Sequence, residues 1–361
     1  MRMEIAREWG MAELVTLEEI RGAQRRLAGV AVRTGLYRVD AERLRAARVA
    51  DELPFELWVK AESEQPIGSF KLRGAYNRVA QMTAEALGRG VITYSSGNHG
   101  QGVAYAARAL GAKAVVVMPA SAPAVKIEAV RTLGAEVVLV GAASEERRAK
   151  AEALAAEFGY TVVPPYDDPA IVAGQATCGL EILEQLGSSE GRTVILSPVS
   201  GGGLLSGIAA AVKLSDAVGV QVWGAEPELA ADAKESFETK TLVEWPAERT
   251  TRTISDGLRT QSLGRLNFAH IVRFVDGIVT VSEEEIVSAM RVMLAATGMV
   301  AEPSGAVTMA AALFHHAELP RCERMVVVLS GGNIEEGMRR ELEAGIGAHA
   351  PSASPQTVAG V

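Results

Sequence analysis

The sequence has few cysteines, few aromatic residues and no long hydrophobic run. Cys178 and Cys322 are the only cysteines in 361 residues. They lie far apart and outside any spacing typical of metal ligands, so we expect free thiols in a reducing compartment. No window is long and apolar enough to span a membrane, and segment 1–10 carries charges where a signal peptide would be apolar. We therefore expect a cytoplasmic protein without membrane contact.

Basic residues are also scarce relative to acidic ones. The 36 Lys and Arg residues face 44 Asp and Glu residues, and the net charge is -8. Because a general nucleic-acid binder needs a basic footprint, we expect no nucleic-acid partner. The chain is long enough for one large or two ordinary domains with buried cores.

A repeated pattern of apolar strand, Gly-rich or Ser-rich loop and amphipathic helix runs through most of the chain. Parallel strands need helical crossovers, so the pattern predicts an α/β fold with mainly parallel, doubly wound sheets. Residues 231–262 read as irregular, and the Gly, Ala, Ser and Pro content beyond Ala344 predicts a disordered tail. The strands are expected at 55–61, 91–94, 114–118, 136–140, 161–163, 193–197, 221–225, 278–281 and 325–329, and the helices include 71–81, 121–133, 144–158, 170–186, 283–297 and 304–316.

Lys71 lies in the stretch Ser-Phe-Lys-Leu-Arg-Gly-Ala at 69–75, between Phe70 and Leu72. An apolar setting removes hydration from an ammonium group, so the pKa of the lysine falls toward that of an amine able to attack an aldehyde. Taken alone, the stretch favours an ordinary surface lysine at a helix start. Three loops further along the chain favour the chemical interpretation.

Each of these loops follows a predicted strand. The run 200–204 (Ser-Gly-Gly-Gly-Leu) opens a helix and suits a phosphate, although a tight turn is the alternative. Its spacing differs from the dinucleotide fingerprint, and it lacks the lysine of a nucleotide P-loop. The run 95–100 offers hydroxyl, amide and backbone donors to a carboxylate or phenolate, and 330–333 is a third such corner. Ligands bind outside the carboxyl ends of parallel strands, so all three loops and Lys71 can face one cleft.

Taken together, these four motifs resemble the fold type II pyridoxal-phosphate enzymes, and most closely their threonine/serine dehydratase (ammonia-lyase) and serine racemase branch. The resemblance covers roughly residues 16–340, with the family's motif order and spacing. It implies two doubly wound α/β domains with the cofactor in the cleft between them. The large domain would comprise 16–84 and 169–344, the small domain 85–168, and the tail 345–361.

The resemblance also implies a role for each motif residue toward pyridoxal 5'-phosphate. Lys71 would form the Schiff base, and Ser330 would bond the pyridine nitrogen. A serine cannot keep that nitrogen protonated as a carboxylate would, which favours prompt β-elimination. Ser200 stands where many relatives have a glycine, but its hydroxyl can still donate to phosphate. The remaining contacts would come from Phe70 on the ring, Asn98 on the phenolic oxygen, Gly257 and Glu302 beside the cofactor, and Ser200, Gly201, Gly202, Gly203 and Leu204 on the phosphate.

The implied reaction converts L-threonine, L-serine or a related β-hydroxy amino acid to a 2-oxo acid and ammonia, with the Lys71 amine removing the α-proton. The chain ends soon after its last predicted helix, which favours a catabolic-type enzyme without a regulatory domain, and a homodimer or higher homo-oligomer is expected. Arg147 is a plausible partner that closes over the substrate. The substrate carboxylate would lie on Ser95, Ser96, Gly97, Asn98 and His99.

Two other functions remain open. A serine racemase with side elimination is one, because Ser96 aligns with the family's second acid/base, although we expect elimination to outpace racemisation. The other is a catalytically silent metabolite sensor, against which the joint presence of Lys71, Asn98 and Ser330 argues.

A metal site is also implied by the resemblance. Racemase-like members hold a divalent cation with a glutamate, a carbonyl four residues on and an aspartate six residues on. Those positions are Glu226, Ala230 and Asp232. Oxygen-only ligation suits Mg²⁺ or Ca²⁺. The alternative is a pair of solvated acids following a strand.

Overall fold

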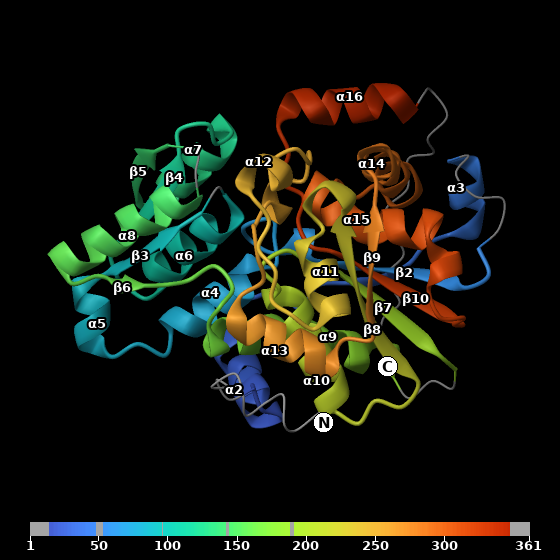
Figure 1. The fold of residues 1–361 in the computed structure, drawn as a ribbon, viewed down its shortest axis with the longest axis horizontal. Helices are drawn as coiled ribbons and strands as arrows, with labels where there is room; N and C mark the ends of the chain where they lie inside the picture. The colour runs from blue at the N-terminus through green and yellow to red at the C-terminus, as the bar shows by residue number, and fades with distance from the viewer. Residues whose placement is uncertain (1–13, 48–52, 96, 142–143, 188–190, 347–361) are drawn as a thin grey trace.

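The computed structural model describes residues 14–47, 53–95, 97–141, 144–187 and 191–346. Two sheets organise these residues, as Figure 1 shows. The larger has six strands in the order β1-β2-β10-β7-β8-β9, and the smaller has four in the order β5-β4-β3-β6. Their bounds are β1 (Leu36–Arg38), β2 (Glu56–Ala61), β3 (Val91–Tyr94), β4 (Ala114–Pro119), β5 (Glu136–Val140), β6 (Thr161–Val162), β7 (Thr193–Pro198), β8 (Val220–Pro227), β9 (Gly277–Val281) and β10 (Arg324–Leu329).

Every strand pair in these sheets is parallel except the pair of β1 with β2. The predicted α/β fold with mainly parallel sheets is therefore confirmed. The antiparallel β1 lies in a stretch where the sequence predicted no strand. It is only three residues long, which is too short for an alternation pattern to stand out.

Helices cover both faces of each sheet. The helices of the smaller sheet are α5 (Ala84–Arg89), α6 (Asn98–Ala109), α7 (Ala124–Thr132) and α8 (Ser144–Phe158). One face of this sheet packs on α6 and α7, and the other packs on α8 through Ala151. In Figure 1 this part of the chain lies at the left.

The larger sheet is enclosed in the same way. One face packs on α14 and α15, and the other on α2, α9, α10 and α13. The remaining helices are α2 (Leu17–Leu27), α3 (Ala41–Ala46), α4 (Lys71–Val79), α9 (Pro169–Leu186), α10 (Gly203–Leu214), α11 (Asp232–Thr239), α12 (Ala247–Thr250), α13 (Arg265–Phe274), α14 (Glu283–Thr297), α15 (Pro303–Phe314) and α16 (Glu336–Ile346), with the short 3₁₀ turns η1 (Glu62–Glu64), η2 (Glu228–Ala230), η3 (Asp256–Leu258) and η4 (His316–Glu318).

The expectation of an irregular segment at 231–262 was wrong. Residues 231–262 contain α11, α12 and η3. The first turn of α11 is stabilised from outside the segment, because the Glu226 carboxylate accepts hydrogen bonds from the backbone N–H groups of Ala233 and Lys234. At the carboxyl end, α16 continues to Ile346, beyond the predicted start of the tail at 345, and residues 347–361 lie outside the described part.

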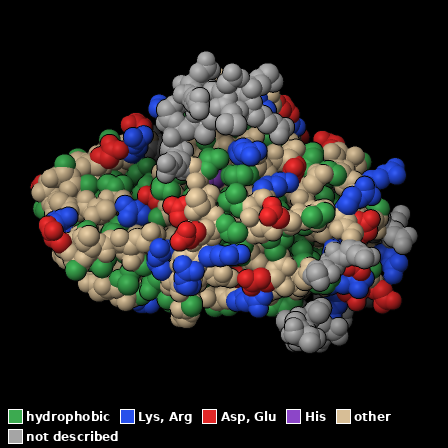
Figure 2. Space-filling model, turned by 90° about the horizontal axis from the view of Figure 1, so that it is seen from below, with side chains coloured by type: hydrophobic (Ala, Val, Ile, Leu, Met, Phe, Trp, Pro, Cys, Tyr) green, Lys and Arg blue, Asp and Glu red, His purple; other side chains and the backbone are tan. Residues whose placement is uncertain are grey.

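No helix within the described ranges is both long and apolar enough to cross a membrane. On the face that Figure 2 draws, basic and acidic side chains are interspersed over the described surface. The fold brings the start of α4 between the two sheets, where α4 packs against α6 on one side and α9 on the other. Lys71 is the first residue of α4 and lies at this junction.

Candidate active site

Lys71 is partly buried, and its amine is held by the main chain. Its Nζ donates a hydrogen bond of 2.9 Å to the carbonyl oxygen of Pro165 and lies 5.1 Å from the centre of the Phe70 ring. Burial lowers the pKa of Lys71 from 10.5 to about 8, although the nearby Glu302 carboxylate opposes the shift. A substantial fraction of the lysine is therefore the neutral amine near pH 8, in accord with the apolar setting that the sequence predicts.

The predicted phosphate loop forms a cradle at the start of α10. Gly202 has φ +95°, a left-handed conformation that favours glycine, and a Cβ there would lie 2.9 Å from Cβ of Asn267. A Cβ on Gly201 would lie 2.4 Å from the ring of Tyr166. The chain therefore accepts no side chain at these positions, which lie at the N-terminus of α10. This geometry fits a phosphate.

Residues from α13 and the preceding loop support this cradle from behind. The Gly201 carbonyl accepts hydrogen bonds from the Asn267 side chain at 2.7 Å and from the Gly264 N–H at 3.0 Å. The Ser200 hydroxyl lies 2.5 Å from the Thr260 hydroxyl and accepts a hydrogen bond from the Thr260 N–H at 3.2 Å. Ser200 therefore lies in the predicted phosphate loop and also contacts Thr260 of a neighbouring loop. Leu204 follows as a buried residue of α10.

Asn98 begins α6 and contacts two residues of the larger-sheet region. Its side-chain amide donates to Glu302 Oε1 at 2.6 Å, and its oxygen accepts from Asn333 at 2.9 Å. Asn98 is therefore held at the cleft by both ends of its amide. Burial raises the pKa of Glu302 to about 7, with Lys126 acting in the opposite direction.

Lys126 of α7 also approaches Glu302. Its Nζ forms an ion pair with Asp256 of η3 and lies 3.7 Å from Glu302 Oε2. The side chain of Lys126 also packs against the loop before α6, because a Cβ on Gly97 would lie 2.5 Å from Lys126 Cδ. A cation from the smaller-sheet region thus bridges two acids of the larger-sheet region.

Ser95 and Gly97, which precede α6, are joined by a hydrogen bond. The Ser95 hydroxyl accepts a hydrogen bond from the Gly97 N–H at 3.1 Å. His99 is buried and its Nε2 lies 3.1 Å from the Val163 carbonyl, so Nε2 carries the proton. Burial, assisted by Lys71, lowers the pKa of His99 to about 3, and the ring is neutral. Ser96, the predicted second acid/base, lies outside the described residues.

The other predicted contacts fall around Ser304, at the start of α15. Its hydroxyl accepts a hydrogen bond of 2.9 Å from the Gly257 N–H, and its carbonyl lies 3.5 Å from the Ser330 hydroxyl. Ser330 also accepts a hydrogen bond from the Phe70 N–H through its carbonyl. Gly257, Ser330 and Phe70 thus lie close together. Arg147 lies on α8, which packs on the face of the smaller sheet opposite α6.

The predicted metal ligands lie where β8 ends. Glu226, Ala230 and Asp232 are all buried. Among the residues that the structure describes, neither carboxylate oxygen of Asp232 has a hydrogen-bond partner. Burial raises the pKa of Asp232 to about 8, and burial together with Asp232 raises the pKa of Glu226. These carboxylates are not the solvated acids of the alternative interpretation, and their donor atoms fit a hard cation. They are only two acids, and no group of three or more His, Cys, Asp or Glu side chains suited to a metal occurs within the described ranges.

Sequence reasoning missed several residues of this region, namely Lys126, Asp256, Thr260, Asn267 and Asn333. Asp256 directly precedes Gly257 and Asn333 ends the loop 330–333, but neither was given a role. Lys126 and Asn267 lie within helices and carry no local signal, since only their distant partners distinguish them from surface residues.

The family of the chain follows from comparison with known proteins. Residues 39–331 match the model of the family described as pyridoxal-phosphate dependent enzyme. An L-threo-3-hydroxyaspartate ammonia-lyase of Saccharomyces cerevisiae is 39% identical over 79% of this chain and 85% of its own. A serine racemase of Schizosaccharomyces pombe is 35% identical over 89% of this chain and 95% of its own. The chain therefore belongs to the pyridoxal-phosphate dependent enzymes, as the motifs indicated.

The fold agrees with this membership. The crystal structure of a threonine deaminase superposes with a TM-score of 0.80 at 42% identity, covering 89% of this chain and 99% of the other. The protein is thus a pyridoxal-phosphate dependent enzyme whose relatives include ammonia-lyases and a racemase.

Proposed function

We propose that this protein is an ammonia-lyase that converts L-threonine, L-serine or a related β-hydroxy amino acid to a 2-oxo acid and ammonia. The observation that carries the proposal is the Lys71 amine, which has a pKa of about 8 and lies on the Pro165 carbonyl. Two relatives support the substrate class, because one is a hydroxyaspartate ammonia-lyase and the other a threonine deaminase.

Each motif residue has a role in this proposal. Pyridoxal phosphate, when bound, supplies the electron sink for the charge that develops at the substrate α-carbon. Lys71 would hold the cofactor and then take the α-proton, for which an amine with a pKa near the working pH is suited. The Gly201 to Gly203 N–H groups would bind the phosphate, Asn98 the phenolic oxygen, and Ser330 the pyridine nitrogen, with Phe70, Ser200, Leu204, Gly257 and Glu302 around the ring and phosphate.

The substrate carboxylate would bind at the loop 95–99. Neutral His99, with its proton on Nε2 toward Val163, keeps a charge out of this loop. In the proposal, Arg147 closes over the substrate when the domain formed by 85–168, which carries both Arg147 and this loop, closes on the domain formed by 16–84 and 169–344. Racemisation is the second candidate function, supported by the serine racemase relative and dependent on Ser96 as a second acid/base.

We also propose that Glu226, the Ala230 carbonyl and Asp232 hold Mg²⁺ or Ca²⁺. The supporting observation is that both Asp232 oxygens are buried without a hydrogen-bond partner, which is costly unless a proton or cation compensates the charge. The cation would order the segment after β8 without entering the reaction.

The proposed setting is a cytoplasmic homodimer. Both cysteines are free and buried, which suits a reducing compartment. Light scattering of the purified protein across a concentration series tests the assembly, and a monomer at all concentrations would contradict it.

A substrate screen tests the activity. Purified protein with pyridoxal phosphate is offered L-threonine, L-serine and L-threo-3-hydroxyaspartate, while L-alanine and L-aspartate serve as controls without a β-hydroxyl. We expect 2-oxo acid and ammonia in equal amounts from at least one hydroxylated substrate and none from the controls. A D-isomer formed faster than the 2-oxo acid would favour the racemase, and no product from any substrate would contradict both functions.

A further inference from the structure

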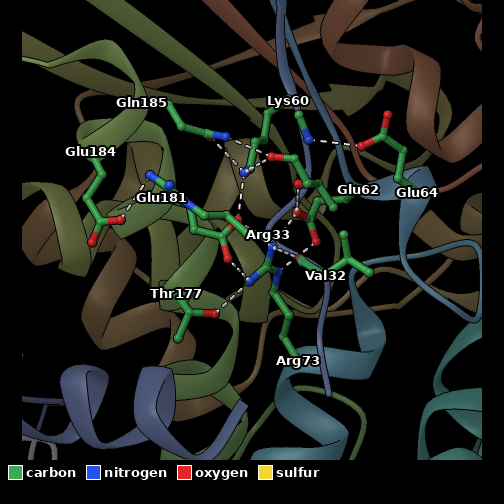
Figure 3. A network of polar contacts seen from close by, with 12 residues as sticks. Val32, Arg33, Lys60, Glu62, Glu64, Arg73, Thr177, Glu181, Glu184 and Gln185 are labelled. Carbon is green, nitrogen blue, oxygen red and sulfur yellow. Dashed lines mark hydrogen bonds and ion pairs between the residues drawn. The ribbon is translucent and has the colours of Figure 1, made fainter. Parts of the chain in front are cut away.

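Beneath the start of α4 lies a cluster of four charged side chains that the reaction does not use: Lys60, Glu62, Arg73 and Glu181 (Figure 3). Each of the four is buried, with 0% exposure at Lys60 and Glu62, 1% at Arg73 and 8% at Glu181. Buried charges are costly unless they are paired and hydrogen-bonded. Such a cluster beside a catalytic helix therefore calls for a physical explanation.

Arg73 is the centre of this cluster. It forms two hydrogen bonds to Glu62, both 2.7 Å, and two to Glu181, of 2.7 and 2.8 Å. It also donates to the Thr177 hydroxyl at 3.1 Å. The planar guanidinium thus binds two carboxylates as two forks, an arrangement that a lysine cannot reproduce.

Lys60 completes the charge balance from a different element. Its Nζ donates to Glu181 at 2.6 Å, to Gln185 at 3.0 Å and to the Thr34 carbonyl at 2.9 Å. Lys60 belongs to β2, whereas Arg73 belongs to α4. Lys60 and Arg73 therefore both bind Glu181, but Lys60 links it to β2 and Arg73 links it to α4.

The electrostatics of Glu62 show that the cluster is strongly attractive. Burial would raise the pKa of Glu62, but Arg73, with help from Lys60, lowers it to about 2. The Glu62 carboxylate is therefore ionised at every working pH, and the Arg73 fork on it persists.

Arg73 lies two positions after Lys71 in α4. At 3.6 residues per turn these side chains lie roughly 200° apart around α4, on opposite faces. The N-terminus of α4 has no side-chain cap. The helix α4 also approaches α9, the helix that carries Glu181, closely, since a Cβ on Gly174 would lie 2.6 Å from Gly74 Cα. The first turn of α4 is thus fixed by Arg73 on one face while Lys71 projects from the other.

We propose that Arg73 is the positioning residue of Lys71: its double fork to Glu62 and Glu181 fixes the first turn of α4 so that the Lys71 amine is held on the Pro165 carbonyl, away from bulk water. Lys60 balances the charge of the same cluster without this role. The inference rests on the proposed role of Lys71 as the cofactor lysine.

The test compares Arg73→Lys with Lys60→Met in the full-length chain. Both variants perturb one cation of the cluster, but only the first loosens α4. Two properties are measured besides the melting temperature: the dissociation constant of pyridoxal phosphate, and the pH profile for labelling of the Lys71 amine by an amine-reactive reagent after the cofactor is removed. Glu62→Gln is a third variant, which breaks one Arg73 fork and leaves the hydrogen bonds of Lys60 intact.

We expect Arg73→Lys to move the labelling midpoint of Lys71 upward from about 8 by about one unit, because a loosened turn exposes the amine to water. The cofactor dissociation constant should rise at least about tenfold, which is about 1.4 kcal/mol at 25 °C. Lys60→Met should lower the melting temperature but leave both properties unchanged. If Arg73→Lys does not fold, Glu62→Gln should move both properties in the same direction.

The inference is overturned if the variants at Arg73 and Glu62 lower only the melting temperature, as Lys60→Met does. Borohydride reduction of the wild-type holoenzyme, followed by peptide mapping, separates this outcome from failure of the proposed function. Cofactor trapped on another lysine would remove Lys71 from the proposed site. Cofactor trapped on Lys71, with unchanged labelling in the variants, would remove only Arg73.

Discussion

Asn98 and Glu302 are joined by a hydrogen bond of 2.6 Å although they lie 204 positions apart in the sequence. Asn98 starts α6 beside the smaller sheet, and Glu302 precedes α15 beside the larger one. Lys126 reaches the same carboxylate from α7 and forms an ion pair with Asp256. The contacts across the cleft therefore depend on the ionisation of Glu302.

Lys126→Met should change the pH dependence of stability. The pKa of Glu302 is raised from 4.5 to about 7, chiefly by burial, while Lys126 lowers it. The folded state keeps the proton of Glu302 where the unfolded state has lost it, so stability falls as pH rises from about 4.5 through about 7. Without Lys126 the pKa of Glu302 rises further, so we expect the free energy of unfolding to keep falling above pH 7. Denaturant unfolding at a series of pH values measures this.

Lys126→Arg is the control for this experiment, because it retains the cation. In the Lys126→Arg variant, the fall of stability with rising pH should end near pH 7, as in the wild type. Equal pH profiles for Lys126→Met and Lys126→Arg would contradict the electrostatic role of Lys126.

Lys71→Ala should abolish turnover and the visible absorption of the bound cofactor while leaving the fold intact. The variant removes the amine that is proposed to bond the cofactor, whereas the fold loses one hydrogen bond, from Lys71 to Pro165. Far-UV circular dichroism, the absorption spectrum and activity are measured. Lys113→Ala, which removes an exposed lysine bonded to Tyr160, should retain colour and activity. An active Lys71→Ala would overturn the cofactor site.

Gly202→Ala should weaken cofactor binding as well as stability. The left-handed conformation costs an alanine about 1–2 kcal/mol, and the new Cβ would also crowd Asn267 behind the cradle. Gly29→Ala is a matched control, because Gly29 has φ +78° and no atom within 4 Å of the added Cβ. Both variants should melt lower, but only Gly202→Ala should raise the dissociation constant of pyridoxal phosphate. Equal cofactor affinity in the two variants would exclude the cradle.

Chelation should destabilise the protein more at pH 8 than at pH 6. Burial raises the pKa of Asp232 from 3.8 to about 8, so without a cation the folded state keeps a proton that the unfolded state loses. Stability then falls as pH rises through this window. A cation binds the ionised form, and its stabilisation should grow over the same range. Melting temperatures with EDTA and with Mg²⁺ or Ca²⁺ at both pH values measure this.

The double variant Glu226→Gln with Asp232→Asn should lose the response to added cation. Glu228→Gln, which changes an exposed acid in the same turn, should keep it. A wild-type melting temperature that is equal with chelator and with cation would remove the metal from the proposed function.

The main strands, the helices that follow them and the Lys71 motif could all be predicted from the sequence. Their signals are short-range: apolar alternation, capping boxes such as Thr16 with Glu19, and glycine runs after strands act within a few residues. The glycine run at 200–204 also indicated a phosphate site, with a tight turn as the alternative that the sequence left open. Local physics was sufficient for these elements, and the family comparison agrees with them.

Only the tertiary structure decided which charges meet. The pairs of Lys126 with Asp256 and of Arg73 with Glu181 join residues 130 and 108 positions apart. In the sequence each of these side chains resembles an ordinary surface charge. Their pairing arises because the two sheets and α4, α6 and α9 pack around one junction, and burial there makes an unpaired charge too costly to leave.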